Sequence, residues 1–166
     1  MALSEKQEYF RKRMLNAWLF RFFLFLRLPM GWATGMKVIA LETDRAATTV
    51  AHRWLNQNPF KSMYFAVMAM AAELSTGALA LLAIEGIKPS VASIIVNMDG
   101  EFIKRATSRV KFTCEDGKAV FDAVERCLVT GESEVVKMRT VGRTSDGTEV
   151  AIFHFTWSFK QRGNKK

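Results

Sequence analysis

The sequence predicts an α+β domain in which a curved, mostly antiparallel sheet of about six strands wraps a long apolar helix. Residues 63–84 form an apolar run long enough for one buried helix. Segments typical of β-strands lie on both sides of that run, and the last of them has an apolar residue at every second position. These residues share one face and are Ala151, Phe153, Phe155, Trp157 and Phe159.

The first 30 residues are predicted to form a helical extension. Residues 14–33, MLNAWLFRFFLFLRLPMGWA, have the composition of a membrane anchor or signal. However, Arg21 and Arg27 would be costly at the centre of a bilayer, and no clear cleavage site follows. We therefore expect an amphipathic helix that docks on its own protein, with attachment to a membrane surface as the second choice.

Two strands are expected next, over residues 36–43 and 46–54, joined by a turn at Asp44-Arg45. Asn58 and Pro59 then predict the start of the long helix, with Ser62 as an alternative start one turn later. Gly86 and Pro89 predict its end. A strand is expected over 91–97, and it resumes at 102–103 after a bend at 99–100. A further strand over 109–114 and a helix over 117–130, capped by Asp116, follow. The last two strands are expected over 134–143 and 149–160, joined by the turn TSDG.

The long apolar segment has two interpretations, a membrane span or the axis of a fold. Glu73 lies near its middle and is followed by Ser75, Thr76 and Gly77, which disfavours a span. A helix that is apolar all round can be buried inside a sheet that wraps it. We favour this second interpretation because the rest of the chain supplies the sheet.

Composition limits the class of protein. A chain of 166 residues with 49% hydrophobic and 24% charged residues is typical of one folded domain, here residues 1–166 with a basic tail at 160–166. Cys114 and Cys127 are expected to be reduced thiols of a cytoplasmic protein. The formal charge of +8 attracts phosphates of any kind. Nucleic-acid binding is not favoured because the aromatic residues fall at core spacing, and His52 and His154 have no nearby ligand partners, so no metal is expected.

Glu73 and the start of the long helix are the candidate chemical groups. Burial should raise the pKa of Glu73, which suits a general base or a nucleophile, although an idle acid at a subunit interface fits equally well. Free N–H groups between Phe60 and Phe65 can polarise a carbonyl. Tyr64 and Glu73 are about 13 Å apart along one helix, so one site would need two antiparallel chains.

Three segments carry a resemblance to a known family. The run NPFKSMYFAVMAMAAELSTG, the earlier LPMGWATGMKV and the closing FHFTWSFK are similar to the DUF4442 group of hot-dog thioesterase-like proteins. The resemblance covers nearly the whole chain, including the N-terminal helix and the extra helix at 117–130. It implies a hot-dog fold in which the curved sheet surrounds the central helix.

The resemblance also implies an activity, namely hydrolysis of acyl-CoA or of another acyl thioester by homodimers or dimers of dimers. No cofactor is implied beyond the coenzyme A of the substrate, which a carrier protein can replace. In related thioesterases of the phenylacetate-pathway type an Asn precedes a His-Gly-Gly run, and an acid follows on the helix. Asn58 and Glu73 match that Asn and that acid, whereas Tyr64, Phe65 and Ala66 stand in place of His-Gly-Gly.

The roles carried over by this resemblance are specific. The backbone at Tyr64 and Phe65 would polarise the thioester carbonyl, Glu73 of the partner subunit would act as base or nucleophile, and Asn58 would order the loop or a water. The hydroxyls of Ser62 and Tyr64 are auxiliaries. The candidate side chains for binding substrate phosphates are Lys61, Lys104, Arg105 and Arg109.

A second function remains open from the sequence. The chain can instead be a non-catalytic acyl- or lipid-binding hot-dog protein, which in one version attaches to a membrane through residues 5–27. The absent glycines favour this alternative, and the acid retained in an apolar helix favours the enzyme.

Overall fold

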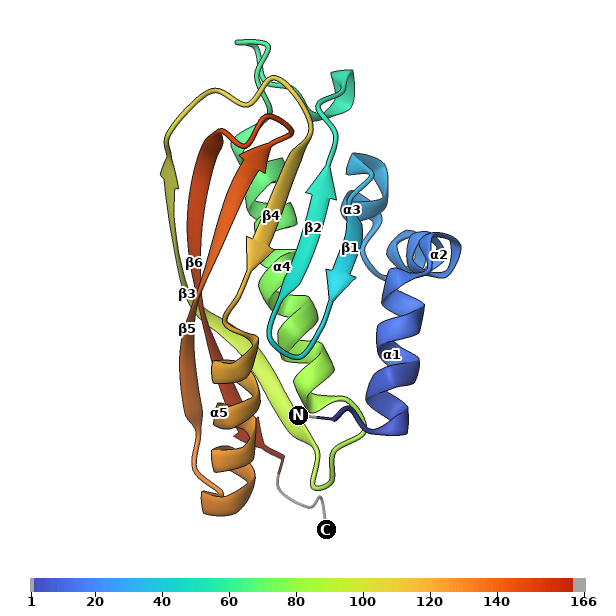
Figure 1. Ribbon diagram of the computed structural model, residues 1–166, viewed down its shortest axis with the longest axis vertical. Coiled ribbons are helices and arrows are strands. Elements are labelled where there is room, and N and C mark those ends of the chain that lie inside the picture. Colours follow the sequence, from blue (N-terminus) through green and yellow to red (C-terminus); the bar gives the residue numbers. More distant parts are fainter. Residues whose placement is uncertain (1, 163–166) are drawn as a thin grey trace.

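The computed structural model describes residues 2–162, in which six strands surround one long helix (Figure 1). The helices are α1 (Glu5–Leu15), α2 (Ala17–Arg27), α3 (Pro29–Thr34), α4 (Phe65–Ile84) and α5 (Gly117–Thr130), with a 3-10 turn at Trp54–Asn56. The strands are β1 (Lys37–Leu41), β2 (Ala46–Val50), β3 (Val91–Phe102), β4 (Val110–Cys114), β5 (Glu134–Thr144) and β6 (Glu149–Gln161). The predicted α+β class is confirmed. The last four residues of the predicted basic tail lie outside the described residues.

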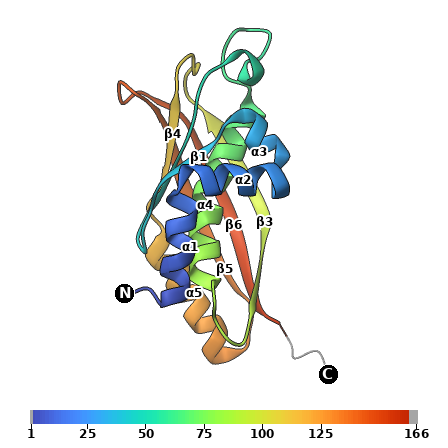
Figure 2. The same cartoon turned by 90° about the vertical axis from the view of Figure 1, so that its right-hand side faces the viewer.

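The strands form one antiparallel sheet in the order β1-β2-β4-β5-β6-β3. The sheet curves around α4, as Figures 1 and 2 show. The predicted alternation in the last strand is confirmed, because Ala151, Phe153, Phe155, Trp157 and Phe159 are all buried. The sheet's concave face and α4 therefore make the core.

The central helix α4 is long and apolar enough to cross a membrane by length and composition, with a mean hydropathy of 1.8 over its most apolar window. However, 72% of that window is buried inside the molecule. Buried polar groups of α4 find partners in the sheet: the hydroxyl of Thr48 donates to the carbonyl of Ala71 over 2.6 Å, and Ser75 and Thr140 share a 2.8 Å hydrogen bond. These bonds satisfy groups that would otherwise be costly in the core.

The N-terminal extension consists of three helices rather than the single helix that the sequence predicted. Asn16 ends α1 and begins α2, where its side-chain oxygen accepts from the N–H groups of Trp18 and Leu19 over 3.1 Å each. Pro29 occupies the first turn of α3, and Gly35 ends that helix with φ of 72°. Figure 2 shows α1 running alongside α4, and α2 lying across the C-terminal end of α1.

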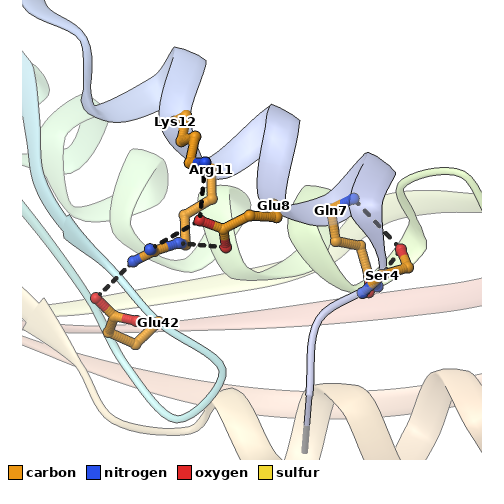
Figure 3. A network of polar contacts seen from close by, with 6 residues as sticks. All are labelled: Ser4, Gln7, Glu8, Arg11, Lys12 and Glu42. Atoms are coloured by element: carbon orange, nitrogen blue, oxygen red, sulfur yellow. Dashed lines mark hydrogen bonds and ion pairs between the residues drawn. The ribbon is translucent and has the colours of Figure 1, made fainter.

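Side-chain contacts fix α1 to the rest of the molecule (Figure 3). Ser4 and Gln7 form a capping box at its start. Arg11 bridges Glu8 and Glu42, at 2.9 Å from each carboxylate, and so ties α1 to the turn between β1 and β2. Gln7 also donates to the carbonyls of Leu82 and Ala83, over 3.1 and 3.4 Å, at the C-terminal end of α4.

Three predicted element boundaries were wrong. β2 ends at Val50, before the 3-10 turn, so it is shorter than the predicted strand. β3 passes through residues 99–100 without a break, and its register shift lies between Ile95 and Asn97 instead. The helix α4 begins at Phe65 rather than near Pro59 or Ser62, for a reason that the loop before it makes clear.

Candidate functional site

A groove of about 550 Å³ lies at the N-terminal end of α4, between the loop that precedes the helix and the segment that follows β3. Both segments are close in space because the N–H of Met63 donates to the carbonyl of Ala106 over 2.7 Å. The groove is lined by Asn58, Pro59, Phe60, Ser62, Met63, Tyr64, Phe65, Met68, Phe102, Ile103, Lys104, Arg105 and Ala106. Its wall is mostly apolar with a basic margin.

Asn58 organises this loop instead of capping the helix. Its side-chain oxygen accepts from the N–H of Phe60 over 3.0 Å and from both the N–H and the hydroxyl of Ser62 over 3.2 Å. This tight turn, with Lys61 at a φ of 57°, uses the residues that the sequence assigned to the first turn of the helix. The expected Asn58 cap is therefore wrong, and Tyr64 stands at the N-cap with no side-chain cap bond.

The start of α4 keeps backbone donors free toward the groove. The N–H of Tyr64 is bound to the carbonyl of Asn56 over 2.8 Å. Within residues 2–162, the N–H groups of Phe65 and Ala66 make no hydrogen bond. Free N–H groups at the positive end of a helix dipole can hold a negatively charged oxygen.

Asn56 and Arg53 hold the loop beside the candidate site in place, and sequence reasoning missed them. The buried Asn56 amide donates to the carbonyls of Thr34 and Ala51 over 2.9 and 2.7 Å. Arg53 donates to the carbonyl of Thr34 over 2.7 Å. Together they fasten the loop before α4 to the end of α3. No local signal distinguishes Asn56 from Asn58 in the sequence NQN, because the partners of Asn56 are distant in the chain.

Glu73 lies eight residues into α4 and is half-buried. Among residues 2–162 its carboxylate has no hydrogen-bond or ion-pair partner, and loss of hydration raises its pKa above the ordinary 4.5. Gly77, one turn later, makes room for it, because a Cβ there would lie 2.9 Å from Oε1 of Glu73. Beside them the indole N–H of Trp157 donates to the hydroxyl of Thr76 over 3.0 Å, and that hydroxyl donates to the Glu73 carbonyl. The acid is thus held in an apolar, closely packed setting.

One face of α4 is less covered than the rest of the helix. Ala66, Ala69, Met70 and Glu73 are only half-buried, whereas Ala71, Ala72 and the residues from Leu74 to Ala80 are buried. These half-buried positions recur at three- and four-residue spacing, so they share one side. Glu73 therefore lies on the side of the central helix that the protein's own sheet leaves open.

The predicted basic residues separate into two groups. Lys104 and Arg105 line the groove, and the Arg105 guanidinium donates to the carbonyl of Phe60. Arg109 instead lines a second hollow, of about 580 Å³, together with Lys111 and Arg143. Lys61 is exposed in the loop before α4 but does not line the groove.

Neither histidine lies at the groove. His154 faces Asp99, with Nδ1 and Oδ1 2.9 Å apart, and His52 follows β2. In the part of the chain from residue 2 to 162, no cluster of three His, Cys, Asp or Glu side chains is placed to hold a metal ion.

Comparisons place this architecture among known proteins. A family model described as "Domain of unknown function (DUF4442)" matches residues 16–159. No curated protein matches the chain by sequence. Among solved structures, a protein of unknown function from Pseudomonas aeruginosa, PA5026, described as "Probable Thioesterase", is similar over 96% of this chain and 99% of its own, with a TM-score of 0.75 and 16% identity.

Two further solved structures are similar. Thioesterase HI1161 from Haemophilus influenzae has a TM-score of 0.61 and 12% identity over 86% of this chain and 90% of its own. The E. coli PaaI protein from the phenylacetic acid degradation operon has a TM-score of 0.60 and 13% identity over 89% of this chain and 94% of its own. At these identities the likeness establishes the fold.

Proposed function

The chain belongs to the DUF4442 family and has the hot-dog fold, and on this basis we propose that it is a thioesterase that hydrolyses acyl-CoA or related acyl thioesters. The observation that carries the proposal is Glu73. A half-buried carboxylate that has lost hydration and has no partner within residues 2–162 is costly for the fold, and a carboxyl group with a raised pKa is well matched to proton transfer near neutral pH. The names of the similar thioesterase structures support the same reaction class.

The start of α4 supplies the second part of the site. The free N–H groups of Phe65 and Ala66 would donate to the thioester oxygen and stabilise the negative charge that develops as water adds to the carbonyl. The groove beside them would hold the acyl chain or the pantetheine arm. Lys104, at its margin, would meet a phosphate of coenzyme A, and Arg105 would do so while keeping its bond to Phe60.

A complete site needs two chains. Phe65 and Glu73 of one helix are about 12 Å apart, too far to act on one carbonyl. The open face of α4 and the outer edge of β3, which within residues 2–162 pairs with β6 alone, would therefore meet the same elements of a partner in a homodimer. Ile94, Val96 and Met98 on β3 are exposed apolar side chains that such a contact would cover.

The reaction would proceed as a water addition. Glu73 of the partner subunit would take a proton from a water as its oxygen bonds to the thioester carbon, and the N–H groups would hold the resulting oxyanion. Collapse of that intermediate breaks the carbon–sulfur bond, and the proton passes from Glu73 to the leaving thiolate. In the alternative version Glu73 attacks the carbon directly, and water then hydrolyses the acyl-enzyme anhydride.

A second candidate function is binding of an acyl group without turnover. The observation that favours it is the aromatic cluster at the groove, where Tyr64 packs on Phe65 at 4.8 Å between ring centroids and Phe65 on Phe102 at 6.3 Å. These rings stand where glycines would allow a substrate to approach the backbone closely. A groove of this kind can hold an acyl chain in place.

Hydrolysis of a panel of acyl-CoA substrates, from short to long and aromatic, tests the proposal. We expect Glu73→Gln to lower kcat by about 100-fold or more while the oligomeric mass is unchanged. The matched control is Glu85→Gln, which removes the half-buried acid at the other end of α4 and should keep activity near wild type. Absence of turnover by the wild type on every substrate, with acyl-CoA still bound, would instead establish the binding protein.

A further inference from the structure

The helix α2 presents an apolar face to solvent, which we call the outer face. Its residues are Trp18, Leu19, Phe22, Phe25 and Leu26. All are more than half exposed, from 51% for Leu19 to 85% for Trp18. Phe20 and Leu24, on the opposite side of the helix, are 4% and 1% exposed and hold α2 on the core. The residues of the outer face are therefore not needed to pack α2 on the core.

Aromatic and basic side chains extend and border the outer face. Trp32 of α3 packs edge-on against Phe25, with ring centroids 5.4 Å apart, and the guanidinium of Arg21 lies 5.0 Å from the centre of the Trp32 ring. Arg27, in the last turn of α2, is also exposed. Arg21 and Lys37 also line a hollow of about 440 Å³ beneath α2.

The charge of this region is predominantly positive. Residues 9–41 contain six basic residues and no acidic residue, and the acid beside α2 is Glu85, which lines a hollow together with Leu19 and Phe23. Arg11 is paired with Glu8 and Glu42. The other five are Lys12, Arg13, Arg21, Arg27 and Lys37, and all of them are exposed. An apolar surface within a positively charged region is complementary to a surface that is itself apolar and negatively charged.

We propose that the outer face of α2, continued by Met30 and Trp32 of α3, docks on the surface of an anionic lipid membrane. α2 has 11 residues and is about 16 Å long, which is too short to cross a bilayer, so it would lie in the interface. Tryptophan, phenylalanine and leucine enter the headgroup region, and flanking arginines contact lipid phosphates.

A second copy of this chain is a poorer occupant of the same face. In a symmetric pair each copy would bring the same predominantly positive region to the interface, so like charges would meet. Anionic lipid headgroups instead supply the opposite charge. The anchoring of α1 through Arg11 and Gln7 means that α2 would bind as a preformed helix.

Vesicle flotation with the full chain tests this proposal. We expect binding to vesicles that contain phosphatidylglycerol, weaker binding to pure phosphatidylcholine, and a decrease with added salt. The triple variant Trp18→Ser, Phe22→Ser, Phe25→Ser should lose at least about tenfold in affinity, because the three rings supply most of the buried apolar area. The control variant Val129→Ser, Val135→Ser removes exposed apolar side chains elsewhere and should bind as the wild type does.

Charge has its own matched pair of variants. Arg21→Gln, Arg27→Gln should weaken binding to the anionic vesicles by about tenfold, whereas Lys118→Gln, Arg126→Gln removes the same charge from α5 and should not. The proposal is overturned if the wild-type protein does not bind anionic vesicles, or if the triple variant binds them as tightly as the wild type does. It is also overturned by wild-type self-association without lipid that the triple variant abolishes, since the occupant would then be a second copy.

A fluorescence measurement on the wild-type protein tests the same contact without depending on whether the triple variant folds. Bromine-labelled phosphatidylglycerol vesicles should quench tryptophan fluorescence, and Trp18→Phe should reduce the quenched fraction of the protein that is bound. Quenching that is the same in Trp18→Phe as in the wild type would show that another surface contacts the lipid.

Discussion

Two helices of this protein, α2 and α4, are both rich in apolar residues but differ in what surrounds them. α4 lies inside the curved sheet, and Ala71, Leu79 and Leu82 are fully buried. α2 lies at the outside of the molecule against α1, α3 and β1 (Figure 1), and only Phe20 and Leu24 of its 11 residues are buried. Apolar composition therefore does not determine burial here; the number of neighbouring elements does.

The charged residues of the two helices show the same difference. The single acid of α4, Glu73, loses water and has a raised pKa. The two basic residues of α2, Arg21 and Arg27, stay in solvent. The acid of α4 has therefore lost hydration, whereas the basic side chains of α2 are solvated and available for long-range attraction. Three predictions separate these environments.

A large loss of stability is expected for Leu79→Ala in α4. Leu79 is fully buried, so the substitution leaves a cavity and should lower the free energy of unfolding by about 2–5 kcal/mol. Urea denaturation followed by circular dichroism measures it. A loss below about 1 kcal/mol would show that α4 is not enclosed by the sheet in solution.

An effect of the opposite sign is expected for Glu73→Gln. Because the pKa of Glu73 is raised in the folded protein, ionising this group costs stability above that pKa, and the cost disappears as the pH falls below 4.5. The variant should therefore have a Tm a few degrees higher than the wild type near pH 7. Each kcal/mol gained in the free energy of unfolding raises Tm by about 2–4 °C.

Melting curves at a series of pH values check this prediction. The difference in Tm should shrink as the pH is lowered and vanish near pH 4, and Glu85→Gln should show no comparable gain. Equal Tm values at neutral pH would indicate that Glu73 has a polar partner in solution.

The smallest effect is expected for Phe22→Ala on the outer face of α2. Phe22 is 62% exposed, so its truncation should change the free energy of unfolding by no more than about 0.5 kcal/mol. Phe20→Ala, two residues earlier and 4% exposed, should cost about 3–5 kcal/mol in the same denaturation experiment. Similar losses for both would mean that α2 is covered on both sides.

The fold was accessible from the sequence where local pattern and tertiary packing agree. The apolar residues at every second position of β6 face the core, and the apolar run of α4 is buried inside the sheet. The local pattern matches the final packing in both cases, so both elements were predicted. The break between α1 and α2 had a local signal in Asn16, whose side chain caps α2. That signal was outweighed by the apolar run around it.

The candidate site was less predictable because distant contacts decide its geometry. Asn58 and Pro59 carry a helix-start signal, but hydrogen bonds from Asn56 to Thr34 and Ala51 hold the loop so that α4 begins at Phe65. The distribution of basic side chains likewise depends on the path of residues 103–109, which brings Lys104 and Arg105 to the groove and Arg109 to another hollow. The position of Glu73 in the central helix was predicted. Its location on the uncovered side of that helix was not, because this depends on how far the sheet extends around α4.

The bonds from Gln7 to Leu82 and Ala83 have a consequence for the order of folding. They join residues 75 and 76 positions apart in the chain, so they can form only when the end of α4 is already in place. Closing so long a loop costs conformational entropy before any contact compensates for it. We therefore expect α1, and with it α2, to assemble late onto a folded sheet and core helix, and to open first when the protein unfolds.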